Sequence, residues 1–306
     1  MHVFRGVEHR VAVTVAPRSA TVGVRTVSPV GQTACMQTPI TIESAADPRL
    51  DDYRALTDAA LRKRYEHQRG VLIAEGPNPV RELVSSPYPL RSVLIAEERI
   101  DAFGDVVASA AAADADVYAV SRDMLYDVVR FKLHQGVIAC GQRLPTAGAQ
   151  QVLDGARRVA VLEGLNDHEN LGALFRSARG LGIDAVLLGP GCADPLYRRS
   201  VRVSMGHVLH VPHAWLPDLQ SGLDALHRSG FVTLALTPDP SAMDLRDVEA
   251  ASGERVAVLL GAEGPGLTDV ALTGATRRAR ISMHGGVDSI NVAAAAAIAF
   301  HALGRR

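Results

Sequence analysis

Residues 162–178 read Leu-Glu-Gly-Leu-Asn-Asp-His-Glu-Asn-Leu-Gly-Ala-Leu-Phe-Arg-Ser-Ala, and this stretch decides the fold. An apolar strand is expected to end near Glu163, a polar loop follows, and a helix is predicted to begin near Asn170. The apolar residues of that helix recur at helical spacing and form a core stripe, from which Arg176 points away. Taken alone, the simplest interpretation makes Asn170 a helix N-cap and Arg176 a solvated surface charge.

The alternation of short apolar runs and helical patterns continues to the C-terminus, which is typical of parallel strands with crossover helices. A last helix, from about Val292 to Gly304, is apolar almost all round, so burial on several sides is predicted for it. Residues 158–306 therefore predict one α/β domain, with strands expected at 159–162, 185–188, 208–211, 231–236, 256–260 and 279–281.

A second, smaller α/β domain is predicted for residues 46–142, where short apolar runs again alternate with helices and parallel strands are expected. Residues 143–157 have the composition of a loop and are predicted to be a linker. Residues 1–45 show no helical period, so we expect a flexible extension there; alternatively, translation begins at Met36.

The composition limits the classes of protein to consider. With 47% hydrophobic and 21% charged residues, the 306-residue chain is expected to fold around a packed core. The three cysteines are far apart and form no C-x-x-C pair, which favours a reducing cytosol over a disulfide framework. No apolar run approaches the roughly 20 residues that span a bilayer, so we expect a cytoplasmic protein without a membrane partner. The net charge of −1 means that a nucleic-acid partner would require a local basic face.

Two further segments offer chemistry at the ends of predicted strands. Residues 258–267, Val-Leu-Leu-Gly-Ala-Glu-Gly-Pro-Gly-Leu, run from a strand into a glycine-rich turn that carries Glu263. Ligands of open α/β sheets bind beyond the carboxyl ends of strands, which is where this turn would lie. Residues 281–292, Ile-Ser-Met-His-Gly-Gly-Val-Asp-Ser-Ile-Asn-Val, break a strand, and Ser289 or Asn291 can cap the final helix. Each segment alone also fits an ordinary turn or cap.

Other kinds of site are disfavoured by spacing. Neither of the two Gly-Pro-Gly runs, at 189–191 and 264–266, supplies the third glycine of a G-x-G-x-x-G fingerprint, and no Walker lysine is present. A dinucleotide or nucleoside triphosphate site is therefore not expected. His207, His210 and His213 are regularly spaced, but no carboxylate or cysteine completes an obvious metal site beside them. We expect no metal and interpret them as surface or core histidines.

Together and in this order, the three segments resemble the three motifs of the SpoU (TrmH-like) family of RNA ribose methyltransferases, which belongs to the knotted SPOUT superfamily. The first motif, N-x3-N-x-G-x3-R, falls on Asn166, Asn170, Gly172 and Arg176. The second, L-G-A-E-G-x-G, falls on residues 260–266. The third, I-P-M…S-L-N-V, falls on Ile281, Met283, Ser289, Asn291 and Val292. The resemblance covers residues 158–306, about half of the chain.

The resemblance implies an S-adenosylmethionine-dependent enzyme that methylates a ribose 2′-hydroxyl. It also implies a trefoil knot and an obligate homodimer, in which the second subunit completes the site of the first. The cofactor contacts it implies come from Gly261, Ile281 and Ile290, with Met283 nearby. Arg176 is the implied catalytic group, and the residues implied to orient it and the RNA are Asn170, Glu263, Ser289 and Asn291. Because the pKa of arginine exceeds about 12, positioning and electrostatic stabilisation describe its role better than general-base catalysis.

The smaller domain resembles the substrate-binding domain that is often fused to this family and that is similar to ribosomal RNA-binding proteins. The match rests on residues 70–76 and the helix after them. A basic stretch (Arg62, Lys63, Arg64 and Arg69) either contacts phosphates or forms a solvated helix face. This layout favours structured ribosomal RNA over tRNA as substrate.

The chain departs from the family pattern at three positions, where Ser282 replaces proline, Ile290 replaces leucine and Ala293 replaces a common serine. None of these changes removes a polar group with an implied role, although Ile290 would alter the fit of the adenosine pocket. Two alternatives to the main interpretation stay open: a tRNA ribose methyltransferase, and a catalytically silent knotted protein that binds RNA. Retention of Arg176, Glu263, Ser289 and Asn291 speaks against the silent protein.

Overall fold

A computed structural model of the chain describes residues 38–54, 56–58, 65–66, 68–248 and 254–303. By its contacts the chain divides into two units, residues 1–35 and 36–306, and the described residues all belong to the second. Residues 1–37 of the predicted extension and the basic residues at 62–64 lie outside the described residues. None of the helices within the described residues is long and apolar enough to cross a membrane.

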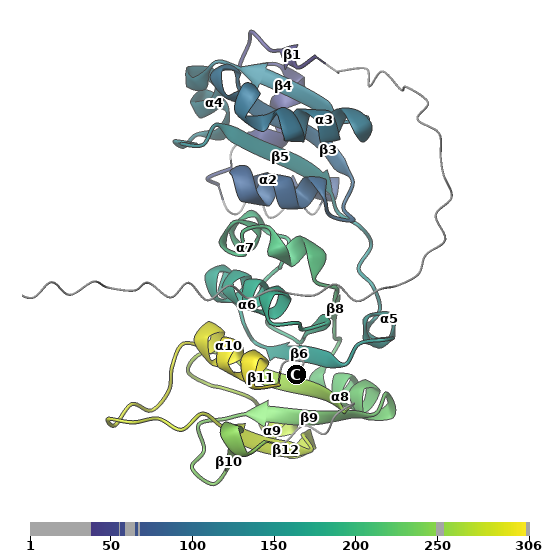
Figure 1. Cartoon of the computed structure of the whole chain (residues 1–306), viewed down its shortest axis with the longest axis vertical. Coiled ribbons are helices and arrows are strands. Elements are labelled where there is room, and N and C mark those ends of the chain that lie inside the picture. The colour runs from purple at the N-terminus through teal and green to yellow at the C-terminus, as the bar shows by residue number, and fades with distance from the viewer. Residues whose placement is uncertain (1–37, 55, 59–64, 67, 249–253, 304–306) are drawn as a thin grey trace, which may run out of the picture. The chain divides into compact units, whose positions relative to one another are not determined.

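The N-terminal half of the second unit contains a five-stranded sheet in the order β1-β4-β3-β5-β2. Its strands are β1 (Ile40–Thr41), β2 (Val71–Glu75), β3 (Leu90–Ala96), β4 (Asp116–Val120) and β5 (Val137–Gln142). Its helices are η1 (Pro48–Tyr53), α2 (Pro77–Val84), η2 (Glu97–Arg99), η3 (Asp101–Phe103), α3 (Gly104–Ala112) and α4 (Arg122–Val129). Figure 1 shows this sheet with α2, α3 and α4 around it.

Two details of this half differ from the sequence expectation. The strand β5 runs antiparallel to both β2 and β3, although the sequence pattern predicts parallel strands throughout. Apolar periodicity identifies a buried strand, but it carries no information about strand direction. In addition, β1 pairs with β4 and Ile42 is buried, so residues 40–42 are part of the folded domain rather than of the predicted extension.

The C-terminal half contains a seven-stranded, wholly parallel sheet in the order β10-β12-β9-β11-β6-β7-β8. Its strands are β6 (Arg158–Glu163), β7 (Ala185–Leu188), β8 (His213–Trp215), β9 (Phe231–Leu236), β10 (Met243–Asp244), β11 (Arg255–Gly261) and β12 (Arg277–Arg280). Its helices are α5 (Ala149–Leu153), α6 (His168–Gly180), α7 (Arg198–Val203), η4 (His207–His210), α8 (Leu219–Arg228), η5 (Leu245–Asp247), α9 (Asp269–Gly274) and α10 (Val292–Leu303). The predicted α/β class is confirmed.

The strand predicted at 208–211 is wrong, because residues 207–210 form the 3-10 helix η4 and the strand begins only at His213. A buried run of four residues cannot be assigned to strand or helix by periodicity alone, and here Gly206, with a φ of +87°, starts a turn instead. The predicted linker also contains the short helix α5, whose Leu153 is fully buried.

Helices cover both faces of the large sheet. Alternate residues of β6 point to opposite sides, so Ala160 and Leu162 share one core with α6 and α10, while Val159 and Val161 share another with α5, α8 and α9. Figure 1 shows α10, in yellow, beside α6 on the first face. Because all seven strands are parallel, their carboxyl ends lie along one edge of the sheet.

Candidate active site at the carboxyl edge of the sheet

A cavity of about 490 Å³ lies at the carboxyl ends of β9, β11 and β12. The segments that follow these strands supply its walls, together with the first residues of α10. Seven of the residues singled out in the sequence line this cavity: Gly261, Glu263, Ile281, Met283, Ser289, Ile290 and Asn291. The glycine-rich turn and the loop before the final helix, which follow different strands, thus face one space.

The glycine-rich turn folds back tightly on the end of β11. A Cβ atom on Gly261 would lie only 2.2 Å from the carbonyl carbon of Gly266, so a larger residue cannot be accommodated without moving the backbone. Gly264 and Gly266 have φ angles of +86° and +72°, which glycine adopts without strain. Glu163 at the end of β6 holds the far side of the turn, since its carboxylate accepts hydrogen bonds from the backbone N–H of Thr268 at 2.9 Å and from its hydroxyl at 2.8 Å.

The side chain of Asn291 joins the three motif segments. Its Nδ2 donates to Oδ1 of Asn170 at 2.7 Å and to Oε1 of Glu263 at 2.8 Å. Its Oδ1 accepts from the backbone N–H groups of Ala293 and Ala294, at 2.9 and 3.2 Å, and so caps α10. One amide therefore connects α6, the glycine-rich turn and α10, and we call this cluster of Asn170, Glu263 and Asn291 the polar node.

Asn170 is not the N-cap of its helix. Asp167 takes that role, because its Oδ1 accepts from the backbone N–H groups of Glu169 at 2.9 Å and of Asn170 at 2.8 Å. The side chain of Asn170 is consequently available to Asn291. Either position satisfies the capping rule on sequence alone, and the helix simply begins two residues earlier than predicted.

Known proteins resemble this chain in sequence. Residues 157–301 match the model of the SpoU rRNA Methylase family, and residues 73–145 match the model for RNA 2′-O ribose methyltransferase substrate binding. An uncharacterized tRNA/rRNA methyltransferase of Mycobacterium tuberculosis is 47% identical over 256 residues, which cover 83% of this chain and 88% of that protein. The chain belongs to the SpoU family. Membership makes it an RNA methyltransferase of the SpoU class.

Solved structures of this family share its fold. The AdoMet-bound rRNA methyltransferase from Sinorhizobium meliloti superposes with a TM-score of 0.73 at 23% identity, covering 86% of this chain and 96% of that one. The SpoU methyltransferase AviRb from Streptomyces viridochromogenes gives a TM-score of 0.68 at 21% identity over 84% of this chain and 96% of that one. The SpoU fold predicted from the motifs is confirmed, and the trefoil knot that goes with this fold stays a prediction.

Arg176 is the one SpoU motif residue singled out for chemistry that belongs neither to the polar node nor to the lining of the 490 Å³ cavity. It lies on the exposed side of α6, about 1.7 turns beyond Asn170, and it does not line the 490 Å³ cavity. Within the described part of the chain its guanidinium makes no hydrogen bond or ion pair. A single SpoU chain thus assembles the cavity and the node but leaves this arginine projecting into solvent.

Some residues of the site carry no signal in the sequence. Leu236, which ends β9, and Thr237 and Pro238, which follow it, line the same cavity. The Thr237 backbone N–H donates to Ala279 O at 2.9 Å. They belong to no SpoU motif. Only the strand order, in which β9 lies between β11 and β12, brings this segment to the site. Strand order cannot be inferred from a single sequence.

Ser282, which stands where the SpoU family usually has proline, holds the segment between two cavity residues in place. Its hydroxyl donates to Oδ2 of Asp244 and accepts from Nη1 of Arg280 at 2.9 Å. Hydrogen bonds from Arg246 and then from Ser282 lower the pKa of Asp244 far below its ordinary value, so this carboxylate is ionised. The link fixes the backbone between Ile281 and Met283, both of which line the cavity.

Two of the three regularly spaced histidines share one carboxylate, and the third has a different partner. His210 lies 2.8 Å from the Glu82 carboxylate and His207 lies 3.6 Å from it, whereas the Nδ1 of His213 is 3.1 Å from the Val211 carbonyl oxygen. Burial lowers the pKa of both His210 and His213. Among the described residues, no group of three or more histidine, cysteine, aspartate or glutamate side chains is placed to hold a metal ion.

Proposed function

We propose that this SpoU protein transfers the methyl group of S-adenosylmethionine to a ribose 2′-hydroxyl of structured RNA, and that this RNA is ribosomal. The observation that carries the proposal is the polar node at the rim of the 490 Å³ cavity, where one amide links Asn170, Glu263 and α10. The preference for ribosomal RNA is supported by the substrate-binding match over residues 73–145.

The cavity suits an adenosine-containing cofactor. Its volume of about 490 Å³ falls within the roughly 300–1,000 Å³ typical of sites for molecules of this size. Ile281, Met283 and Ile290 give it apolar walls, and the missing Cβ of Gly261 keeps the backbone of the turn close to the cavity. S-adenosylmethionine, when bound, supplies a methyl group that is already activated by the sulfonium. Backbone groups of the turn would hold the adenosine, and no metal is required for the transfer.

The RNA side of the reaction falls to the polar groups. We propose that Arg176 binds a phosphate next to the reacting ribose and stabilises the negative charge that develops on the 2′-oxygen. The guanidinium remains protonated, so it acts through charge and not as a base. The polar node, together with Ser289 on the cavity wall, would orient the ribose toward the cavity.

We further propose that a second copy of the chain completes the site, so that the enzyme is a homodimer. The outer side of α10 is apolar, with Ala294 and Ile298 exposed, the latter to 44%. Exposed helix faces are normally polar, so an apolar one marks a surface that another chain covers. Ile298→Glu is expected to yield monomers in light scattering, whereas Val270→Glu, at a residue 43% exposed on α9, is the matched control that leaves the dimer intact.

The function is tested with methyl-labelled S-adenosylmethionine and unmodified ribosomal RNA and tRNA, separated after the reaction. Label in ribosomal RNA that survives alkali as a 2′-O-methyl dinucleotide is the expected result. Arg176→Ala should lower the rate at least about a hundredfold without changing cofactor affinity. Arg179→Ala, on the same helix, is the matched control and should retain the rate. Label in tRNA alone would replace the proposed substrate, and no label with intact RNA binding would indicate a silent binding protein.

A further inference from the structure

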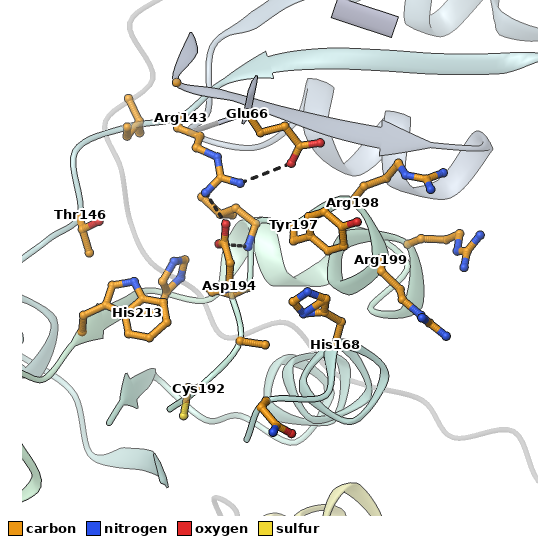
Figure 2. Close-up of a pocket in the computed structure, with 18 of the residues that line it drawn as sticks. Glu66, Arg143, Thr146, His168, Cys192, Asp194, Tyr197, Arg198, Arg199 and His213 are labelled. Atoms are coloured by element: carbon orange, nitrogen blue, oxygen red, sulfur yellow. Dashed lines mark hydrogen bonds and ion pairs between the residues drawn. The ribbon is translucent and has the colours of Figure 1, made fainter. Parts of the chain in front are cut away.

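A second and larger cavity, of about 1620 Å³, lies at the carboxyl ends of β6, β7 and β8 (Figure 2). Its walls include Asn166 after β6, the segment 191–197 after β7, and Trp215 at the end of β8. Both cavities therefore open on the edge of the parallel sheet where ligands of α/β proteins bind. The proposed cofactor accounts for the smaller cavity, and of the SpoU motif residues only Asn166 lines the larger one.

The N-terminus of α6 separates the two cavities. Asn166 and His168 line the larger one, whereas Asn170 reaches the polar node at the rim of the smaller one. His168 and Asn170 are two residues apart in the first turn of α6, which corresponds to about 3 Å along its axis, a distance that one nucleotide can bridge. A strand of RNA whose ribose lies at the node would thus extend into the larger cavity with its neighbouring nucleotide.

Aromatic rings gather in this cavity, although the chain as a whole has only 4% aromatic residues. Trp215 is the only tryptophan of the chain and is 40% exposed. The centroids of the Tyr197 and His168 rings are 4.5 Å apart, and Figure 2 shows the two side chains in this cavity. Exposed aromatic faces at the end of a strand are platforms on which the bases of RNA stack.

Arginines supply charge at the same cavity. Arg199 and Arg202 have side chains that are 52% and 48% exposed. Arg199 pairs with Glu169 at 2.5 Å, but ion pairs this exposed contribute little, so an RNA phosphate can take the place of the carboxylate. Arg143, in contrast, is held between Asp194 at 2.7 Å and Glu66 at 3.7 Å (Figure 2), so it forms part of the wall.

We propose that the larger cavity binds the RNA next to the nucleotide that is methylated, with the adjacent base stacked on Trp215 and phosphates of the same strand beside Arg199 and Arg202. This inference rests on the proposed function, because it requires an RNA strand at the polar node. The cavity is lined mainly by the methyltransferase domain, and Leu56, Glu66 and Gly70 of the N-terminal half also contribute to it. The exposed indole favours a ligand with nucleobases, and the exposed guanidinium groups favour a ligand that is a polyanion.

The single tryptophan makes the subsite directly observable. Stacking of a base quenches indole fluorescence, so an oligoadenylate of about ten nucleotides should quench the emission of Trp215 as it binds. Inorganic polyphosphate, which has charge but no bases, should bind without quenching. Trp215→Ala should weaken binding of unmodified ribosomal RNA about tenfold, and Trp215→Phe should restore most of it. Met243→Ala, at a residue 38% exposed on β10, is the matched control and should bind normally.

Two results would overturn the inference. One is that RNA, at concentrations that saturate filter binding, leaves the indole emission unchanged. The other is that Trp215→Ala binds RNA as well as Met243→Ala does. The cofactor affinity of Trp215→Ala, measured by calorimetry, should equal that of the unsubstituted protein. This control shows that the variant is folded, because a misfolded variant would not bind the cofactor normally. Methyl transfer that proceeds without quenching refutes the subsite alone, whereas quenching without methyl transfer refutes the proposed function alone.

Discussion

Replacing the amide of Asn291 by a carboxylate tests whether the polar node holds the active-site loops together. In Asn291→Asp the side chain still accepts from the backbone N–H groups of Ala293 and Ala294, so the cap of α10 is kept. The two donated hydrogen bonds are lost. A second carboxylate then faces Glu263, across a distance that is now a 2.8 Å hydrogen bond.

The size of the effect follows from the contacts. Each lost hydrogen bond lowers the free energy of unfolding by about 0.5–1.5 kcal/mol. Repulsion between two carboxylates near the surface adds about 1 kcal/mol, and the favourable interaction of a carboxylate with the helix N-terminus offsets roughly 0.3–1 kcal/mol. Asn291→Asp should therefore lower the free energy of unfolding by about 1–3 kcal/mol. When salt screens the repulsion between the carboxylates, Asn291→Ala should lower it by about 1 kcal/mol more than Asn291→Asp does, because alanine also removes the cap of α10.

Urea unfolding of a double-mutant cycle measures this directly. In Asn291→Asp/Glu263→Gln the amide at position 263 can donate to the carboxylate at position 291, which restores the hydrogen bond with its direction reversed. The double variant should recover at least about 1 kcal/mol relative to the sum of the single variants. A coupling energy below about 0.3 kcal/mol, the usual error of additivity, would refute the idea that these two side chains hold each other in place.

Three further predictions concern the surroundings of the node. Gly261→Ala should weaken S-adenosylmethionine binding at least about tenfold in calorimetry while circular dichroism stays native, because its Cβ would meet the Gly266 carbonyl carbon at 2.2 Å; unchanged affinity would contradict this account of the turn. Ser282→Ala should weaken cofactor binding a few-fold at an unchanged saturated rate, and Ser282→Thr should not, because threonine keeps the hydroxyl bound to Asp244. Burial lowers the pKa of His213 below 6.5, so below that pH the unfolded chain binds a proton that the folded chain does not, and stability falls as the pH drops. His213→Asn should remove that part of the pH dependence of the urea midpoint, and an unchanged slope would exclude His213 as its source.

The sequence identifies residues that line the cavity, but it does not identify the order and direction of the strands around them. The three motifs specify glycines and short polar side chains whose chemistry is local, so Gly261, Glu263 and Asn291 are identifiable from the sequence alone, and they do face one cavity. Strand direction and order are not identifiable in this way, because a buried strand has the same apolar pattern in either direction. For this reason the sequence reveals neither the antiparallel β5 nor the contribution of Thr237.

The position of Arg176 shows another limit. Its motif spacing predicts that it belongs to the site, yet helical geometry places it about 1.7 turns beyond Asn170 and outside the cavity. A motif records which residues a family retains and says nothing about whether one chain or two bring them together. The apolar outer side of α10 is the physical reason to expect that a second chain supplies the remainder.

The order of the strands explains why two cavities should serve one substrate. From β6 the chain proceeds to β7 and β8 on one side and later returns to β9 and β11 on the other, so the sheet changes winding direction between β6 and β11. Crevices form at such a switch point, and here α6 starts beside it, with Asn166 facing one cavity and Asn170 facing the polar node. An RNA strand laid along this edge must pass the first turn of α6. If Trp215 stacks the adjacent base, the position of the methylated ribose is set by its distance from that base. Because every base can stack, this neighbouring position should require an unpaired base but not a particular one.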